Sequence, residues 1–313
     1  MRAAVLTSPD GGPTCADFRE PEPIGDRPLL DLVAAGMHQV VRSIASGRHY
    51  GSTDSYPLVL GVDAVAERPD GTRVYTGFTR SPWGTMAERL ATPFEIPLPD
   101  GADPLAIAAG MNPAMSGFMP LVAHLEQHGA LGTVVVLGAT GIAGRAAVQA
   151  AEVLGAECVI AAGRDHEMLE ELASLGAEPV ALTASAEPLA GALQRGAPSL
   201  VLDYVWGPVA ESAFAALGRR GLQDDDADIS YVQIGAVAGA DARVPASLLR
   251  SRKIALRGSG AGSMSTERLM AQLPVLMGHL ADGAIDVRYT AYPLERIAEA
   301  WAHGGRSRAV VTP

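Results

Sequence analysis

The sequence predicts an α/β protein that combines a doubly wound, six-stranded parallel sheet with a smaller β-rich domain. Three observations support this: a glycine-rich turn between an apolar strand and a helix at 134–144, strand–helix alternation from about residue 117, and short β-like runs before it. At 313 residues the chain is long enough for two domains. Its 48% hydrophobic and 19% charged residues are typical of a well-cored globular protein.

The first 116 residues are rich in proline and glycine, and their short apolar runs predict an antiparallel, barrel-like domain. These runs are 3–6, 29–33, 59–66 and 73–77. The following strands are predicted at 133–137, 157–162, 178–182, 199–204, 229–235 and 254–258, with helices between them. The tail contains a helical pattern at 266–280, an amphipathic segment at 294–301 and a strand-like run at 308–311. We therefore expect one domain from residues 1–116 plus 259–313 and a second from residues 117–258.

The glycine-rich turn is the most specific motif in the chain. Residues 134–137 form a continuous apolar run, which is typical of a parallel strand buried on both faces. Gly138, Gly141 and Gly144 follow, and apolar residues then recur at helical spacing. Such a turn allows the backbone to approach a pyrophosphate, which the helix N-terminus stabilises. The sequence thus predicts dinucleotide binding, with a glycine turn kept only for tight packing as the alternative.

The end of the next predicted strand indicates which dinucleotide binds. An NAD-selecting chain usually has Asp or Glu there, because a carboxylate accepts hydrogen bonds from the ribose hydroxyls. Here the strand ends in Gly163 and Arg164. A guanidinium can pair with a 2′-phosphate, so the sequence favours NADPH. Asp165 follows directly and would reach the ribose after a small shift. A solvated residue at a helix start is the alternative for Arg164.

Composition excludes several other classes of protein. The net charge of −11 argues against a nucleic-acid surface. We expect no membrane span, on the grounds that charges interrupt every long apolar run, and no secretory signal, so a cytoplasmic location follows. The acidic segment Gln223 to Asp228 is interpreted as a solvated loop rather than a metal site, because consecutive carboxylates repel and project in different directions.

Several segments, taken in order, resemble a known family. They are GTRVYTGF, GTMAERLATP, NPAMSGFMPLVAH, LDYVWG, YVQIGAVAG, SLLRSRKIALRGSG and the closing PLERIAEAWAHGGRSRAVVTP. With the glycine motif, they resemble the medium-chain dehydrogenase/reductase superfamily, and within it the zinc-independent quinone oxidoreductase group, over essentially the whole length. The resemblance implies a GroES-like barrel domain, a Rossmann domain and NADPH-dependent hydride transfer. The acceptor it implies is a small electrophile, either a quinone or the C=C bond of an α,β-unsaturated carbonyl.

The residues that bind zinc in related enzymes are replaced here. Zinc-dependent relatives carry a Cys in the segment corresponding to VAAGMHQV and a His-Glu pair where this chain has Gly61-Val62-Asp63. Met37 and Val62 are not normal zinc ligands, and the sequence has no four-cysteine lobe for a structural zinc. We expect no metal, and without a Lewis acid direct alcohol–ketone interconversion becomes the less expected chemistry.

The resemblance also implies cofactor contacts at individual positions. Thr140, Gly141, Ile142 and Ala143 are expected to line the pyrophosphate, and Gly163 with Arg164 to meet the 2′-phosphate. Further contacts are expected from strand ends and the domain hinge: Tyr204, Val205, Gly235, Ala236, Val237, Ser259, Gly260, Ser116 and Met115.

Two residues are candidates for catalysis. Tyr50 falls where quinone oxidoreductases often place a tyrosine facing the cleft, and His38 falls where relatives often have Asn. Either could donate a hydrogen bond to the oxygen that gains negative charge when hydride arrives. His38 could instead tune a proton or fill the cleft wall. The alternative for each residue is a surface loop side chain.

Other functions and the oligomeric state follow only from the resemblance. Family members commonly pair through the edge of the dinucleotide sheet, so a homodimer through residues 254–258 is expected. An enoyl-thioester reductase of a biosynthetic pathway and a non-catalytic NADPH- or RNA-binding module are the alternative functions.

Overall fold

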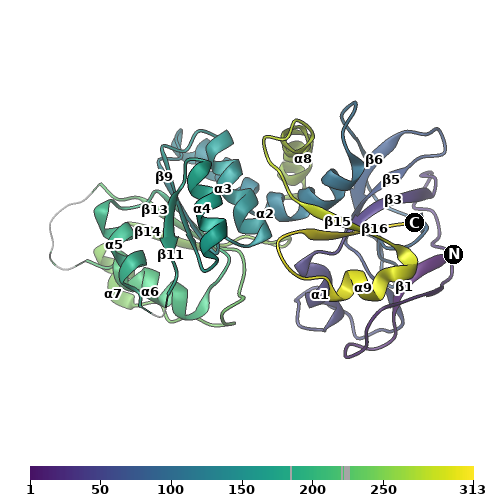
Figure 1. Cartoon of the computed structure of the whole chain (residues 1–313), viewed down its shortest axis with the longest axis horizontal. Helices are drawn as coiled ribbons and strands as arrows, with labels where there is room; N and C mark the ends of the chain where they lie inside the picture. The colour runs from purple at the N-terminus through teal and green to yellow at the C-terminus, as the bar shows by residue number, and fades with distance from the viewer. Residues whose placement is uncertain (184, 220, 222–225) are drawn as a thin grey trace. The chain divides into compact units, whose positions relative to one another are not determined.

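A six-stranded parallel sheet organises the middle of the chain in the computed structural model, which describes residues 1–183, 185–219, 221 and 226–313 (Figure 1). The strand order is β11-β10-β9-β12-β13-β14. The strands are β9 (Thr133–Leu137), β10 (Cys158–Gly163), β11 (Glu178–Ala181), β12 (Leu200–Asp203), β13 (Ile229–Gln233) and β14 (Ile254–Gly258). The predicted fold class is confirmed, and the predicted strands overlap all six.

Helices cover both faces of this sheet, as Figure 1 shows. One side carries α3 (Ile142–Val153) and α4 (His166–Ser174), and the other carries α5 (Glu187–Arg195), α6 (Gly207–Leu217) and α7 (Ala246–Ser251). From β9 the chain first adds β10 and β11 on one side and then β12 on the other. This reversal beside β9 is the switch point at which open α/β sheets bind ligands, at the carboxyl ends of the strands.

The rest of the chain is built mainly on antiparallel strands, apart from the parallel pair β15 and β16. Its seven-stranded sheet has the order β15-β16-β3-β5-β6-β8, with β7 paired to β3, and a three-stranded sheet has the order β2-β1-β4. The strands are β1 (Arg2–Leu6), β2 (Thr14–Asp17), β3 (Leu30–Gly36), β4 (Leu58–Val59), β5 (Asp63–Glu67), β6 (Arg73–Gly77), β7 (Arg89–Leu90), β8 (Ile96–Pro97), β15 (Tyr289–Pro293) and β16 (Arg308–Thr312). The helices are α1 (Gln39–Ala45), the 3-10 turn Leu294–Arg296 and α9 (Ile297–Ala302).

The predicted strand at 59–66 is wrong as a single element, because the chain turns at Gly61 and forms β4 and β5 instead. Gly61 has φ +110°, and a Cβ there would lie 2.3 Å from Thr85 Oγ1. Only glycine adopts this conformation in the available space. The turn places Asp63 at the start of β5, with consequences described below.

Two compact units result, one from Met1–Asn112 with Pro274–Pro313 and the other from Pro113–Leu273. Helices α2 (Pro104–His128) and α8 (Thr266–Ala281) run across these divisions. The divisions expected from the sequence, after residues 116 and 258, lie within α2 and before the start of α8. Strand β16 pairs antiparallel with β3 through Val310 opposite Gly36, so the tail completes the sheet of the first unit.

Helix α2 corrects one expectation from the sequence. It is long and apolar enough, by length and composition, to cross a membrane, so the prediction that charges interrupt every long apolar run is wrong. Of its most apolar window, 72% is buried, and this is the burial of a core helix. It is the one such helix within the described residues.

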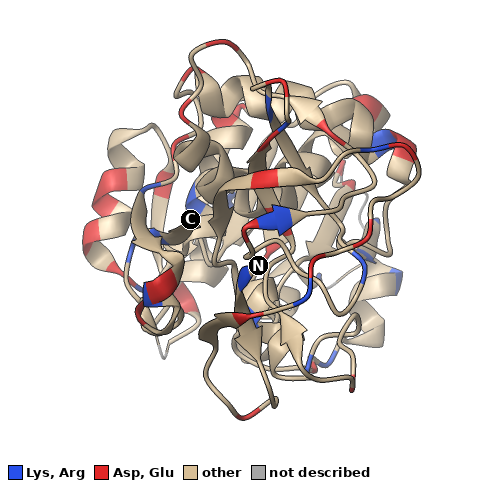
Figure 2. Cartoon of the chain, turned by 90° about the vertical axis from the view of Figure 1, so that its right-hand side faces the viewer, with Lys and Arg blue, Asp and Glu red and all other residues tan. Residues whose placement is uncertain are grey.

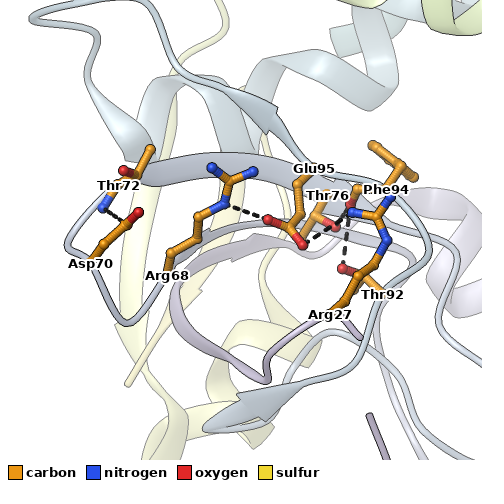
Figure 3. A network of polar contacts seen from close by, with 8 residues as sticks. All are labelled: Arg27, Arg68, Asp70, Thr72, Thr76, Thr92, Phe94 and Glu95. Carbon is orange, nitrogen blue, oxygen red and sulfur yellow. Dashed lines mark hydrogen bonds and ion pairs between the residues drawn. The ribbon is translucent and has the colours of Figure 1, made fainter. Parts of the chain in front are cut away.

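The charged residues show two arrangements in the first unit. On the face drawn in Figure 2, acidic and basic segments are interspersed rather than gathered by sign. Figure 3 shows a polar network in which Glu95, whose side chain is 4% exposed, lies between Arg27 and Arg68. Because Arg68 follows β5 and Glu95 precedes β8, the network ties these two strand ends together. Of the acidic segment Gln223 to Asp228, residues 223–225 lie outside the described residues.

Candidate active site

The turn between β9 and α3 has the shape of a phosphate cradle. Gly138 has φ +91°, and a Cβ on it would lie 2.9 Å from Val205 Cγ2. A Cβ on Gly144 would lie 2.2 Å from the Gly138 carbonyl oxygen. Both positions therefore require glycine, the first for its backbone conformation and the second for close packing of helix against turn.

Within the described residues of α3, no side chain competes with a ligand for the N–H groups at the helix N-terminus. In this described segment Gly141 is the N-cap, no side chain caps the helix, and the first turn has no acidic residue. The first N–H groups of a helix have no intrahelical partner, and the helix dipole favours an anion there. Ile142 and Ala143 lie in this first turn, as the sequence analysis expected for a pyrophosphate site.

Several predicted residues meet at this same edge of the sheet. A Cβ on Gly163, at the end of β10, would lie 2.3 Å from the Thr140 side chain. A Cβ on Gly235, just after β13, would lie 2.5 Å from the Tyr204 carbonyl oxygen. The N–H of Ser259 donates to the Gln233 carbonyl at 2.8 Å. The ends of β10 and β12 thus border the turn after β9, and the ends of β13 and β14 follow along the same edge.

The remaining predicted loop residues are exposed. Gly260 is exposed, and its N–H donates to Ser263 Oγ at 2.8 Å. Ala236 follows β13 directly, and Val237 is 76% exposed. None of these three residues is buried in the part of the unit that the structure describes, so their expected contacts with the cofactor stay predictions.

Ser116 and Tyr204, which are far apart in sequence, are in contact. The Ser116 hydroxyl donates to the Pro113 carbonyl at 2.7 Å, so the Tyr204 hydroxyl, 3.1 Å from Ser116 Oγ, is the donor in that second bond. Burial raises the pKa of Tyr204, which keeps its phenol protonated. A Cβ on Gly117 would lie 2.8 Å from the Tyr204 hydroxyl oxygen, so a glycine is needed beside it.

Arg164 and Asp165 have different roles at the end of β10. Arg164 is exposed directly after the strand. Asp165 is the N-cap of α4, and its Oδ1 accepts a hydrogen bond from the N–H of Met168 at 3.2 Å. Because capping engages this carboxylate, contact with a ribose would compete with the start of α4. The arrangement therefore favours Arg164 as the residue that meets the cofactor.

Asp203 is a site residue that the sequence analysis missed. It is fully buried at the end of β12; its Oδ1 accepts from the N–H groups of Val205 and Trp206 at 2.7 and 2.8 Å, and its Oδ2 accepts from the Tyr231 hydroxyl at 2.7 Å. Burial raises its pKa despite these donors. Asp203 thereby fixes the turn beside Gly138, where Trp206 has the strained φ of +59°. The signal available in the sequence for Asp203 was an acidic residue at the end of an apolar strand.

The first unit contains a buried polar cluster around His38. The imidazole is 1% exposed at the start of α1, and its Nε2 lies 3.2 Å from Asp63 Oδ1. Asp63 Oδ2 accepts from the Tyr75 hydroxyl at 2.8 Å. Arg308, on β16, donates to the Met37 carbonyl at 3.1 Å. Sequence reasoning identified His38 but missed Asp63 and Tyr75 as its neighbours.

Tyr50, the other catalytic candidate, lies on an exposed turn of the same unit. Its side chain is 74% exposed, and its ring centroid is 4.0 Å from that of His49. Its catalytic role stays a prediction. Over the described residues, no group of three or more His, Cys, Asp or Glu side chains is arranged to hold a metal ion.

Comparisons with known proteins agree with this architecture. No family model matches the chain. The probable NADPH-dependent quinone reductase tdiC of Emericella nidulans is 33% identical over 229 residues, which are 67% of this chain and 62% of that protein. The chain therefore spans less than two thirds of that relative's length.

Solved structures align over the whole chain. The quinone oxidoreductase of Thermus thermophilus, solved alone and with NADPH, has a TM-score of 0.80 and 25% identity, with 100% of both chains covered. A putative alcohol dehydrogenase of Sinorhizobium meliloti 1021 has a TM-score of 0.80 and 22% identity, covering 100% of this chain and 96% of that one, and shows the same fold.

A switch-point phosphate cradle and a β-rich unit completed by the C-terminal strand define a member of the medium-chain dehydrogenase/reductase superfamily, and the chain belongs to it. Within the superfamily it is a quinone oxidoreductase-like protein, as its sequence segments indicated.

Proposed function

We propose that this protein is an NADPH-dependent, zinc-independent reductase that transfers hydride to a small electrophile, either a quinone or the C=C bond of an α,β-unsaturated carbonyl. The proposal rests chiefly on the N-terminus of α3, which lies at the switch point and has no side-chain cap. Beside it, the residue offered at the end of β10 is Arg164, because the Asp165 carboxylate caps α4. The names of the relatives, NADPH-dependent quinone reductase and quinone oxidoreductase with NADPH, support both the cofactor and the acceptor class.

The residues present fit a dinucleotide phosphate. A Cβ would fill the cradle at Gly138 and Gly144, and the first turn of α3 offers N–H groups to the pyrophosphate. Arg164 would pair with the 2′-phosphate, and Tyr204, held by Ser116, would border the cofactor beside Gly138. When bound, NADPH supplies hydride.

The protein's own contribution is orientation, exclusion of water and stabilisation of developing charge. Asp203 and Tyr231 hold the turn after β12 rigid, so the cofactor edge needs little reorganisation. On the substrate side we propose Tyr50 as the hydrogen-bond donor to the oxygen that gains negative charge, with His38 beside the substrate. The Met37 and Val62 positions support a mechanism without zinc, since neither side chain is a normal zinc ligand.

The first experiment is a titration of the purified protein with NADPH and with NADH, followed by intrinsic fluorescence. We expect saturable binding that is tighter for NADPH. NADPH oxidation at 340 nm with quinones, enones and enoyl thioesters then identifies the acceptor class. Binding of neither cofactor would contradict the proposal, and binding without oxidation of NADPH by any acceptor would indicate a non-catalytic module.

We also propose a cytoplasmic homodimer. Strand β14 is an edge of the parallel sheet, with Ala255, Arg257 and Gly258 exposed. An unpaired edge of this kind offers backbone groups to a second copy. Light scattering across a dilution series tests this assembly, and a monomeric mass at all concentrations would contradict it.

A further inference from the structure

The cluster around His38 contains more buried polar groups than simple packing requires. His38 is 1% exposed and Asp63 is 6% exposed. Among the described residues, neither ring nitrogen of His38 has a hydrogen-bond partner, and neither has Asp63 Oδ1. Buried groups left without partners destabilise a fold, so such a set requires an explanation.

Asp63 is held firmly in place. Its Oδ2 accepts from Tyr75, and its backbone carbonyl accepts from Thr85 Oγ1 at 2.9 Å. The strand register explains the first contact, because Asp63 lies opposite Gly77 across β5 and β6, and Tyr75 is two residues along on the same face. Asp63 Oδ1 is thereby fixed at 3.2 Å from His38 Nε2.

The imidazole is confined as well. A Cβ on Gly36 would lie 2.3 Å from His38 Nε2 and 2.5 Å from the Ala108 carbonyl, so the ring occupies the space that this glycine leaves open. Any larger residue at position 36 would displace it. The distance of 3.2 Å between His38 Nε2 and Asp63 Oδ1 is within the range of an N–H···O hydrogen bond.

We propose that Asp63 is a positioning residue that holds His38 as the neutral tautomer with its proton on Nε2, leaving Nδ1 as a buried hydrogen-bond acceptor for a hydroxyl or N–H group of the bound ligand. A carboxylate accepts but does not donate hydrogen bonds, so it selects the Nε2–H form. His38 Nε2 and Asp63 Oδ1 then satisfy each other as donor and acceptor, and His38 Nδ1 remains available to the ligand.

The surrounding charges are consistent with a neutral ring. Burial lowers the pKa of His38, and the Arg308 guanidinium lowers it further, while Asp63 opposes both. Tyr75 faces Asp63 with its proton retained, because burial raises its pKa. Arg42, on α1, is the other cation near Arg308.

This inference rests on the proposed function for its ligand. A neutral His38 of this tautomer cannot donate to a developing oxyanion from Nδ1, so the proposal replaces the donor role expected of His38 from the sequence with an acceptor role. Its partner is instead a hydroxyl, such as that of a hydroquinone product, or an amide N–H.

The test is NMR of the full-length protein labelled with ¹⁵N-histidine, with the His38 signals assigned by His38→Gln. We expect the Nε2–H tautomer at neutral pH. In Asp63→Asn the new side-chain amide can donate to Nε2, so the tautomer is expected to switch to Nδ1–H. A wild-type Nδ1–H tautomer, a wild-type imidazolium, or an unchanged tautomer in Asp63→Asn would overturn the proposal.

A second variant covers the case in which Asp63→Asn does not fold. Tyr75→Phe removes the phenol donor from Oδ2, and the less satisfied carboxylate then attracts a proton on His38 more strongly. The Nε2–H tautomer should persist while the His38 pKa rises. A lowered or unchanged pKa would contradict the linkage between the three residues.

Activity gives the functional readout. Asp63→Asn should lower kcat roughly 3- to 10-fold, the effect of one hydrogen bond between neutral groups, and leave NADPH affinity unchanged. Inhibition by 1,4-hydroquinone should weaken in parallel. Asp70→Asn, at an exposed turn outside the cluster, is the matched control and should retain activity. If the wild type reduces no acceptor, the proposed function fails, whereas the NMR result still decides the role of Asp63.

Discussion

At the scale of single residues, the chain separates two tasks between Arg164 and Asp165. The carboxylate caps α4 and the guanidinium extends from the strand end into solvent. In many dinucleotide sites one acidic residue at this position selects the ribose. Here the capping bond engages the acidic side chain, so we expect cofactor selection to depend on its neighbour.

Arg164→Ala should weaken NADPH binding about 10- to 100-fold and leave NADH binding nearly unchanged, because only NADPH carries the 2′-phosphate. The measurement is the dissociation constant of each cofactor by fluorescence titration. Arg195→Ala on α5, where Arg195 pairs with Glu178, is the matched control and should affect neither. Equal losses for both cofactors would remove Arg164 from the phosphate site.

At the scale of elements, α2 carries a histidine that makes it sensitive to acid. His124 is 2% exposed, its ring stacks on that of His128 at 4.2 Å, and neither of its ring nitrogens has a partner among the described residues. Burial, with the nearby charges of His128 and Arg257, lowers the pKa of His124 to about 4. The folded protein therefore keeps this ring neutral where the unfolded chain protonates it.

Stability should fall as the pH drops from about 6.5 toward 4, since in this window the unfolded state binds a proton at His124 that the folded state does not. His124→Leu removes that contribution. The loss of unfolding free energy between pH 7 and pH 4.5, measured by urea denaturation, should be smaller in the variant by about 1–3 kcal/mol. His166→Gln, at an exposed position on α4, should retain the full loss. Identical losses in wild type and His124→Leu would contradict the prediction.

The network of Figure 3 gives a second prediction at this scale, because Glu95 joins the end of β5 to the start of β8 while nearly buried. Glu95→Gln leaves two arginines without their carboxylate and should lower the unfolding free energy by roughly 1–3 kcal/mol. Thermal and urea denaturation measure the change. Glu67→Gln, which breaks the exposed pair with Arg73, should lower it by less than about 0.5 kcal/mol. Similar losses in both variants would show that the burial of Glu95 does not increase the contribution of its ion pairs to the unfolding free energy.

At the scale of the whole molecule, the sequence predicted the parallel sheet and its phosphate turn because both are local patterns. Buried parallel strands are continuous apolar runs, and the turn needs glycine at fixed spacing. The pairs Asp63–Tyr75 and Asp203–Tyr231 were not predictable in this way, since strand pairing brings their members together. The split at Gly61 was missed because the close approach of Thr85, which leaves no space for a side chain at position 61, joins residues that are distant in sequence.

The pairing of β16 with β3 has a consequence for how the chain is made. The second unit is one continuous stretch, Pro113–Leu273, whereas the first needs Pro274–Pro313 in addition to its N-terminal part. During synthesis on the ribosome the parallel-sheet unit is therefore translated in full before the first unit can close its sheet. Until Val310 and Val311 emerge, the β3 edge at Ala35 and Gly36 remains without its neighbour. Nascent chains should thus depend on chaperones at the first unit for longer than at the second.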